Sequence, residues 1–400
     1  MTLGEQLAER PAKVGAGMTG TAEVPVEHPT AGPRFGVEEE FLVIDPETRE
    51  AVPQAEAVLR RAKAELGERV GGEITTLQAE TKTTPCHDVA ELHRQLVEGR
   101  AVLGAAAAAE GLRVMASGSA VLGDVVPPPI VSGERPARGT ATFRGLHDEV
   151  AICSVHVHVE MPDRDRAALV SNHLRPYLPV LIGLTANSPY WAGRDTGYAS
   201  WRTIAWHRWP VAGPPPYFTS AEHYDRVVDT LLDAGALVDL GTLFWDIRLS
   251  AHLPTLEIRV ADVPVTAEES ALYAALVRAL VVRVGTEVDR GEPGPVVAPE
   301  LLRVAYWRAA RDGLAGHGVD PLTGELRPAV ELVDALFRYV RPVLAEQGDL
   351  PLVTSWLDGL LGSAADGAVR QRRAAARRDR LTDVVDDLVA RTVPELVNVD

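Results

Sequence analysis

Cysteine is nearly absent from this chain of 400 residues, which contains only Cys86 and Cys153. Two cysteines are too few for a disulfide framework or a cysteine-rich zinc site, so the sequence indicates a protein of the reducing cytoplasm. Cys153 stands in an apolar stretch, where a buried and unreactive thiol is favoured over a nucleophile.

Long hydrophobic runs and an excess of positive charge are also missing. No stretch of about 18 apolar residues occurs, so no membrane span is expected, and residues 1–20 lack the apolar core of a signal peptide. The 56 acidic residues outnumber the 40 basic ones and give a formal net charge of −16. Because nucleic-acid-binding proteins usually present a basic face, a nucleic-acid partner is disfavoured.

The chain does contain 46% hydrophobic residues, enough for a sizeable core. Prolines and scattered glycines in residues 1–33 predict a mostly disordered extension, followed by a single domain over residues 34–395. We predict strands at residues 34–44, 77–83, 112–117, 152–159 and 255–262. We predict helices at residues 53–66, 88–110, 163–184, 221–234, 265–284, 301–314, 329–347 and 366–388, and we expect the helix at 163–184 to be interrupted near Pro176 and Pro179.

Strands and helices do not alternate regularly along the chain, which favours an α+β fold with a mainly antiparallel sheet. Residues 125–142 are rich in proline, glycine and charge. We expect them to form a loop over the functional site and to decide which substrates fit.

Three of the predicted strands carry a pair of polar residues two positions apart. In chain order these pairs are Glu38 with Glu40, His156 with His158, and Glu257 with Arg259. Side chains two residues apart on a strand share one face, whereas Glu39 has the opposite phase and is expected to be structural. Each pair alone could be a solvated face, a hydrogen-bonded histidine pair or an ion pair. Together they indicate one shared site.

Through these strands and the motifs between them, the chain resembles the type 2 glutamate–cysteine ligase family, the carboxylate–amine ligases of the glutamine synthetase superfamily. The matching stretches stand in the family's order at residues 36–41, 156–159, 184–189, 193–202, 245–248 and 255–262. The resemblance implies a glutamine synthetase-like catalytic domain in which antiparallel strands pack with helices. It also implies ATP-dependent amide formation through an acyl phosphate, with release of ADP and phosphate.

The resemblance further implies roles for individual residues. Phosphoryl transfer depends on positioning and on charge stabilisation by Mg²⁺ or Mn²⁺ and by arginines, and hard cations prefer carboxylate oxygens. The implied metal ligands are Glu38, Glu40, His156 and Glu257, with Glu80 as a fifth. Arg259 would bind a substrate carboxylate or phosphate oxygen with two prongs. Arg202 and Arg248 would stabilise the transferred phosphoryl group, and His158 and Asn187 would lie on the substrate side.

The chain departs from the family pattern around the substrate wall. Residues 118–121 read Gly-Ser-Ala-Val where Gly-Thr-His-Pro is usual, Ser154 replaces a common glycine, and Leu249 replaces a proline. The acid and amine therefore stay open, although the resemblance implies small-molecule substrates and a homodimer. Two alternatives to a ligase also stay open: a phosphotransferase, and a nucleotide- or metabolite-binding regulator without turnover.

Overall fold

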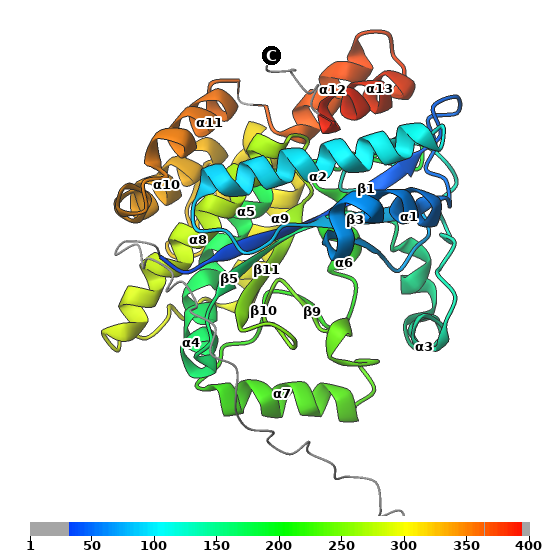
Figure 1. The fold of residues 1–400 in the computed structure, drawn as a ribbon. Helices are drawn as coiled ribbons and strands as arrows, with labels where there is room; N and C mark the ends of the chain where they lie inside the picture. The colour runs from blue at the N-terminus through cyan, green and yellow to red at the C-terminus, as the bar shows by residue number, and fades with distance from the viewer. Residues whose placement is uncertain (1–31, 364, 394–400) are drawn as a thin grey trace, which may run out of the picture. The chain divides into compact units, whose positions relative to one another are not determined.

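The computed structural model describes residues 32–363 and 365–393, so the predicted N-terminal extension lies almost entirely outside the described residues. A seven-stranded sheet with the order β10-β11-β5-β1-β3-β2 forms the centre, and β4 pairs with β1 (Figure 1). All of its strand pairs are antiparallel, which confirms the fold class predicted from the sequence. Its strands are β1 (Phe35–Ile44), β2 (Val70–Gly72), β3 (Gln78–Lys82), β4 (Arg113–Met115), β5 (Ser154–Glu160), β10 (Ile247–Leu249) and β11 (Thr255–Asp262).

Helices pack around this sheet, and α2 and α8 lie side by side over one of its faces (Figure 1). Helix α8 is buried almost all the way round because it also contacts α4, α10 and α11. No helix in the described part of the chain is both long and apolar enough to cross a membrane. The helices are α1 (Ala55–Leu66), α2 (Val89–Ala109), α3 (Glu134–Phe143), α4 (Arg164–Leu174), α5 (Leu178–Thr185), α6 (Trp201–Trp206), α7 (Ala221–Asp233), α8 (Ala267–Asp289), α9 (Pro299–Asp312), α10 (Ala329–Glu346), α11 (Leu350–Ser363), α12 (Gly367–Ala376) and α13 (Leu381–Thr392).

Two predicted segments differ from the structure. Residues 125–142 are not a continuous loop, because α3 occupies much of the segment. Its Pro136 lies in the first turn, where a missing N–H removes no helical hydrogen bond. Residues 366–388 form two helices, α12 and α13, which are separated where Asp379 adopts the left-handed conformation at φ 56°. Helix α11 was not predicted.

Strand β11 contains an extra residue that its alternating sequence does not reveal. Ile258 lies opposite Val157 of β5, but Ala261 lies opposite Val155, so β11 has one residue more than its partner between these points. Such a β-bulge reverses the phase of the side chains that follow it. Asp262 therefore faces the same side of the sheet as Glu257, contrary to the strict alternation expected over the whole strand.

Candidate active site

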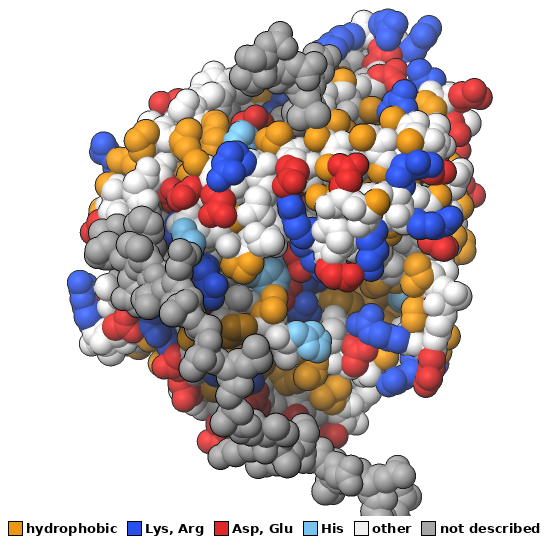
Figure 2. Space-filling view, viewed as in Figure 1, with side chains coloured by type: hydrophobic (Ala, Val, Ile, Leu, Met, Phe, Trp, Pro, Cys, Tyr) orange, Lys and Arg blue, Asp and Glu red, His pale blue; other side chains and the backbone are white. Residues whose placement is uncertain are grey.

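The strand register brings the three predicted pairs to one face of the sheet. The Cα partners are Glu38 with His156, Glu38 with Lys82, Glu40 with Glu80, and His158 with Glu257. These side chains line a cavity of about 750 Å³. Figure 2 shows acidic, basic and histidine side chains around a hollow on this side of the molecule.

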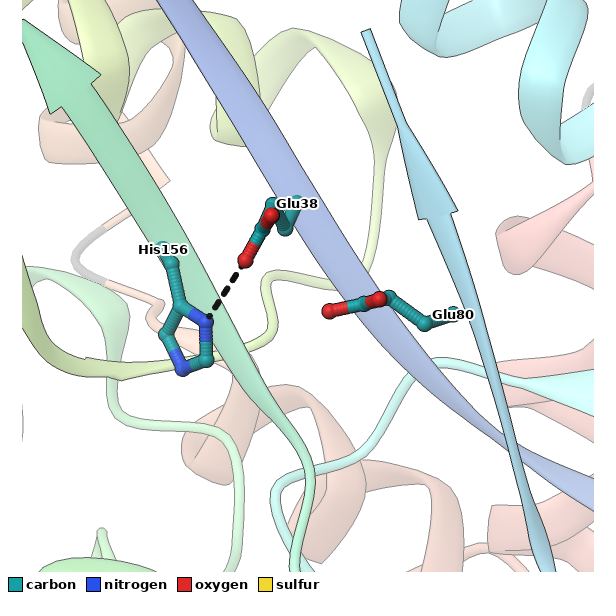
Figure 3. A group of neighbouring side chains, drawn as sticks. All are labelled: Glu38, Glu80 and His156. Carbon is teal, nitrogen blue, oxygen red and sulfur yellow. Dashed lines mark hydrogen bonds and ion pairs between the residues drawn. The ribbon is translucent and has the colours of Figure 1, made fainter. Parts of the chain in front are cut away.

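Three overlapping groups of metal-ligand side chains follow one another along this face. They are Glu38 with Glu80 and His156, Glu38 with His158 and Glu257, and Glu40 with Glu73 and Glu80. Within each group the ligand atoms lie within 4.8 Å of one another. In Figure 3, Glu38 on β1 lies between His156 on β5 and Glu80 on β3. The structure thus brings together all five predicted metal ligands, and it adds Glu73, which lies just beyond β2 and carried no pair signal in the sequence.

His156 is held by a residue that the sequence analysis noted only as a departure from the family. Its Nε2 lies 2.8 Å from the Ser154 hydroxyl, which is also 2.8 Å from Oε1 of Glu40. Burial and the charge of Arg259 lower the pKa of His156, which favours the neutral form of the ring. If Nε2 carries the proton, it donates to Ser154, the hydroxyl donates to Glu40, and Nδ1 accepts a hydrogen bond from Nη1 of Arg259 at 3.3 Å. A cation bound at Nδ1 would take the place of that hydrogen bond.

Negative charge accumulates on this sheet face. Burial and the charge of Glu38 raise the pKa of Glu80 to about 7. Burial and the charges of Glu40 and Glu80 also raise the pKa of Glu73, which is only partly exposed to the cavity. The donors are carboxylate oxygens and imidazole nitrogens, as Mg²⁺ or Mn²⁺ would require. Because a bound cation would relieve the repulsion among these groups, the residues fit a divalent ion.

Glu257 lies between two arginines. Nε and Nη2 of Arg248 are 2.7 and 3.0 Å from its two carboxylate oxygens, and Nη1 of Arg259 donates to it as well. Burial opposes ionisation, but the charges of Arg259 and Arg248 hold the pKa of Glu257 well below its usual range. Two donors of Arg248 are thus used by Glu257. Nε of Arg259, in contrast, is buried without a hydrogen-bond partner among the described residues.

Arg202 lines the cavity, but its hydrogen bonds go to the bulge of β11. Nη1 donates to the carbonyl oxygen of Val260 at 3.2 Å, and Nη2 donates to that of Arg259 at 3.1 Å. Nη1 also lies 3.9 Å from Oδ1 of Asp262. Arg202 therefore fixes the backbone that carries Arg259.

Asn187 is not brought to this cavity. Its side-chain amide donates to the carbonyl oxygens of Ala116 at 3.1 Å and Val263 at 2.9 Å. Its Oδ1 accepts a hydrogen bond from Gln371 at 2.8 Å. Because these contacts satisfy the buried amide within the protein interior, the substrate role predicted for Asn187 has no support in the structure. His158, predicted for the same role, does line the cavity, where its Nδ1 lies 3.0 Å from the Thr255 hydroxyl.

An aromatic wall lines the same cavity as the acidic sheet face. We define it as Phe143, Trp206, Trp209 and Phe244, which are buried and line the cavity. Their ring centroids approach to 4.5 Å for Phe143 with Trp209 and for Trp206 with Phe244. Trp206 and Trp209 thus pack among buried aromatic rings and also line the cavity, and α3 contributes Arg135, Pro136 and Gly139 to the same lining.

Comparisons with known proteins show the family to which this chain belongs. The model of the "Glutamate-cysteine ligase family 2" matches residues 34–390. The chain is 45% identical over 364 residues to a protein of Saccharopolyspora erythraea named "Putative glutamate--cysteine ligase 2-1", covering 90% of this chain and 95% of that protein. It is 43% identical to a protein of the same name in Nocardia farcinica, covering 90% and 94%.

Solved structures show the same fold at low sequence identity. The glutamate–cysteine ligase of Francisella tularensis in complex with AMP has a TM-score of 0.64 at 11% identity, covering 90% of this chain and 88% of that one. A bifunctional glutathione synthetase of Pasteurella multocida has a TM-score of 0.65 at 13% identity, covering 90% and 52%. From the family match and the close relatives, the chain belongs to glutamate–cysteine ligase family 2, a family of carboxylate–amine ligases.

Proposed function

We propose that this protein is an ADP-forming carboxylate–amine ligase. A carboxylate oxygen of one substrate attacks the γ-phosphorus of ATP, which releases ADP and leaves an acyl phosphate. The nitrogen of an amine then attacks the acyl carbon, phosphate leaves, and the nitrogen loses a proton to give the amide. The observation that carries this proposal is the row of acidic and histidine ligands beside Arg259 on one wall of a single cavity.

The divalent cation would be held by the predicted ligands, which are Glu38, Glu40, Glu80, His156 and Glu257. When bound, Mg²⁺ or Mn²⁺ would offset the negative charge of the phosphate groups of ATP. The protein supplies a rigid frame for it, because three adjacent antiparallel strands carry four of these ligands and Ser154 fixes Glu40 through both its N–H and its hydroxyl.

We propose different roles for the three arginines of the cavity. Arg259 has donors left for an anionic group in the cavity, so we propose that it binds the reacting carboxylate or a phosphate oxygen. Arg248 acts through Glu257, to which its Nε and Nη2 both donate hydrogen bonds. Arg202 acts through the backbone of Arg259. Both are therefore proposed as positioning residues instead of direct contacts to the phosphoryl group.

Glutamate and cysteine, named in the relatives, are the first substrates to test. We propose that the acid and amine lie between the acidic sheet face and the aromatic wall, with His158 on their side. The buried free thiols of Cys86 and Cys153 support a reducing cytoplasm. The net charge of −16 supports the absence of a nucleic-acid partner. A homodimer is part of the proposal through the family resemblance.

Product analysis tests the proposal. The purified protein is incubated with ATP, Mg²⁺ and a panel of acids and amines, and ADP is measured by a coupled assay while mass spectrometry identifies the product. A ligase gives amide and ADP in equal amounts. A stable phosphorylated acid or guanidine would favour the phosphotransferase alternative, and nucleotide binding without any product would favour the regulator.

A further inference from the structure

Lys82 stands among the acidic groups that would hold the cation. Its Cα partner on β1 is Glu38, and Glu80 precedes it by two residues on the same face of β3. Its Nζ lies 2.7 Å from Oε2 of Glu80 and 3.2 Å from Oε1 of Glu38. Two of the three ligands drawn in Figure 3 therefore share one ammonium group.

The ammonium and a divalent ion would compete for the negative charge of the same two carboxylates. A Mg²⁺ ion bound by Glu38 and Glu80 would lie about 2.0–2.1 Å from their ligand oxygen atoms. Nζ, at hydrogen-bond distance from one oxygen of each carboxylate, would then face a like charge at close range. Entry of the ion therefore favours movement of Lys82 away from the two carboxylates.

The surroundings of Lys82 allow that movement. Its side chain is 38% exposed and lines the cavity. The strand beyond it presents Gly71, where an added Cβ would lie 3.3 Å from Oε2 of Glu80 and 3.7 Å from Cε of Lys82. A lysine side chain has a flexible four-carbon stem, so its charge can move several ångströms without a change in the backbone.

Lysine is much less frequent than arginine in this protein. The sequence holds three lysines, Lys13, Lys63 and Lys82, among 40 basic residues. The cavity arginines Arg202, Arg248 and Arg259 each donate two or more hydrogen bonds to fixed protein atoms. An arginine at position 82 would hold carboxylates with a rigid fork, whereas a lysine provides a compact charge that can be exchanged.

We propose that the Lys82 ammonium pairs with Glu38 and Glu80 when no cation is bound, and that a divalent cation displaces it from these two carboxylates. The ammonium keeps Glu38 and Glu80 together until a divalent ion enters, and it then turns into the cavity and binds a phosphate oxygen of ATP. Lys82 is thus a positioning residue for the metal ligands and a binding residue for the phosphate groups of the nucleotide. The second half of this proposal rests on the proposed function, whereas the exchange itself rests on the ion pairs alone.

Lysine acetylation measured by mass spectrometry tests the exchange in the unaltered protein. Lys63 is the internal control, because it is 57% exposed on α1 and paired with Glu68. Mn²⁺ alone should speed acetylation of Lys82 several-fold without affecting Lys63, and Mn²⁺ with ATP should slow it again. An unchanged rate at Lys82 under saturating Mn²⁺, or no binding of Mn²⁺ by electron paramagnetic resonance, would overturn the proposal.

Substitution gives a second, independent readout. Without nucleotide, Lys82→Met should lower the Kd for Mn²⁺ by roughly three- to tenfold, since two partly exposed ion pairs no longer compete. The same change should raise the KM for ATP. In Lys82→Arg, neither the Kd for Mn²⁺ nor the KM for ATP should return to the value of the unaltered protein. Lys63→Met should match the unaltered protein in both. The exchange would be contradicted if Lys82→Met shifted the Kd for Mn²⁺ and the KM for ATP in the same direction, or if it shifted neither. Tighter Mn²⁺ binding in a protein that forms no amide would support the exchange and contradict only the proposed ligase function.

Discussion

Glu39 and Arg100 form an ion pair that is fully buried on the sheet face opposite the cavity. Nε of Arg100 donates to Glu39 at 3.1 Å, and its other nitrogens donate to the carbonyl oxygens of Pro264 and Val265 just before α8. The hydroxyl of Ser270 on α8 also donates to Glu39. The residue between the two metal ligands of β1 thus joins that strand to α2 and α8.

Replacing Glu39 should affect stability far more than chemistry. Glu39→Gln leaves the buried charge of Arg100 without its partner, which should lower the free energy of unfolding by about 3–5 kcal/mol. Urea denaturation followed by circular dichroism measures this. The double change Glu39→Gln with Arg100→Met should recover much of the loss, and Glu222→Gln, at an 82% exposed side chain on α7, should cause almost none. A loss below about 1 kcal/mol for Glu39→Gln would refute the importance of the pair.

Arg202 should matter through the position of Arg259. Arg202→Lys keeps the charge but cannot donate to the carbonyl oxygens of both Arg259 and Val260. A small displacement of a substrate-positioning group can cost about 100-fold in rate. We therefore expect kcat to fall at least about tenfold, measured as ADP formation at saturating substrates, with Mn²⁺ affinity nearly unchanged. A variant with normal kcat would show that the bulge holds Arg259 without Arg202.

The aromatic wall should control which substrates are accepted. Phe143→Ala removes a side chain that contacts Trp209 and lines the cavity, so the order of kcat/KM over acids and amines should change. Arg138→Ala on the same helix is a matched control, because Arg138 reaches the carbonyl oxygen of Val238 outside the cavity. An equal loss on all substrates for Phe143→Ala would argue against a role in selection.

The two thiols should be unreactive in the folded protein. Burial raises the pKa of Cys86 to about 12 from 9.0 and raises the pKa of Cys153 well above its usual range. Iodoacetamide at pH 8 should therefore label neither thiol until urea is added, as mass spectrometry would show. Because the folded pKa of Cys86 exceeds the unfolded value, its contribution to stability is complete below about pH 9 and is lost as the pH rises toward 12. Labelling of Cys86 in the native protein at pH 8 would contradict this environment.

The sequence predicted the part of the site that depends on strand periodicity. A period of two residues was enough to predict that Glu38 and Glu40 share one face of the strand and that Glu39 points to the opposite face. The buried ion pair of Glu39 with Arg100 confirms this. It also predicted the helix that begins at Val89, where the Asp88 side chain accepts a hydrogen bond from the N–H of Glu91.

The parts that escaped prediction depend on contacts between distant segments. Lys82 gains its place only when β1 pairs with β3 in a register that sets it opposite Glu38. The bulge near Arg259 is visible only against the partner strand β5. Asn187 looked like a substrate residue because it lies in a matching motif, but its partners Ala116, Val263 and Gln371 come from three other segments.

The central claim is that this acidic sheet face holds the divalent ion for amide formation, and the yields of ADP and amide in one reaction test it most directly. With ATP, Mg²⁺ and an accepted acid and amine, the unaltered protein and Glu222→Gln should form both in equal amounts. Glu80→Gln should abolish both without loss of folding, since burial and the charge of Glu38 already disfavour the ionised Glu80. ADP without amide, equal yields in the presence of a chelator, or near-normal yields from Glu80→Gln would contradict the account.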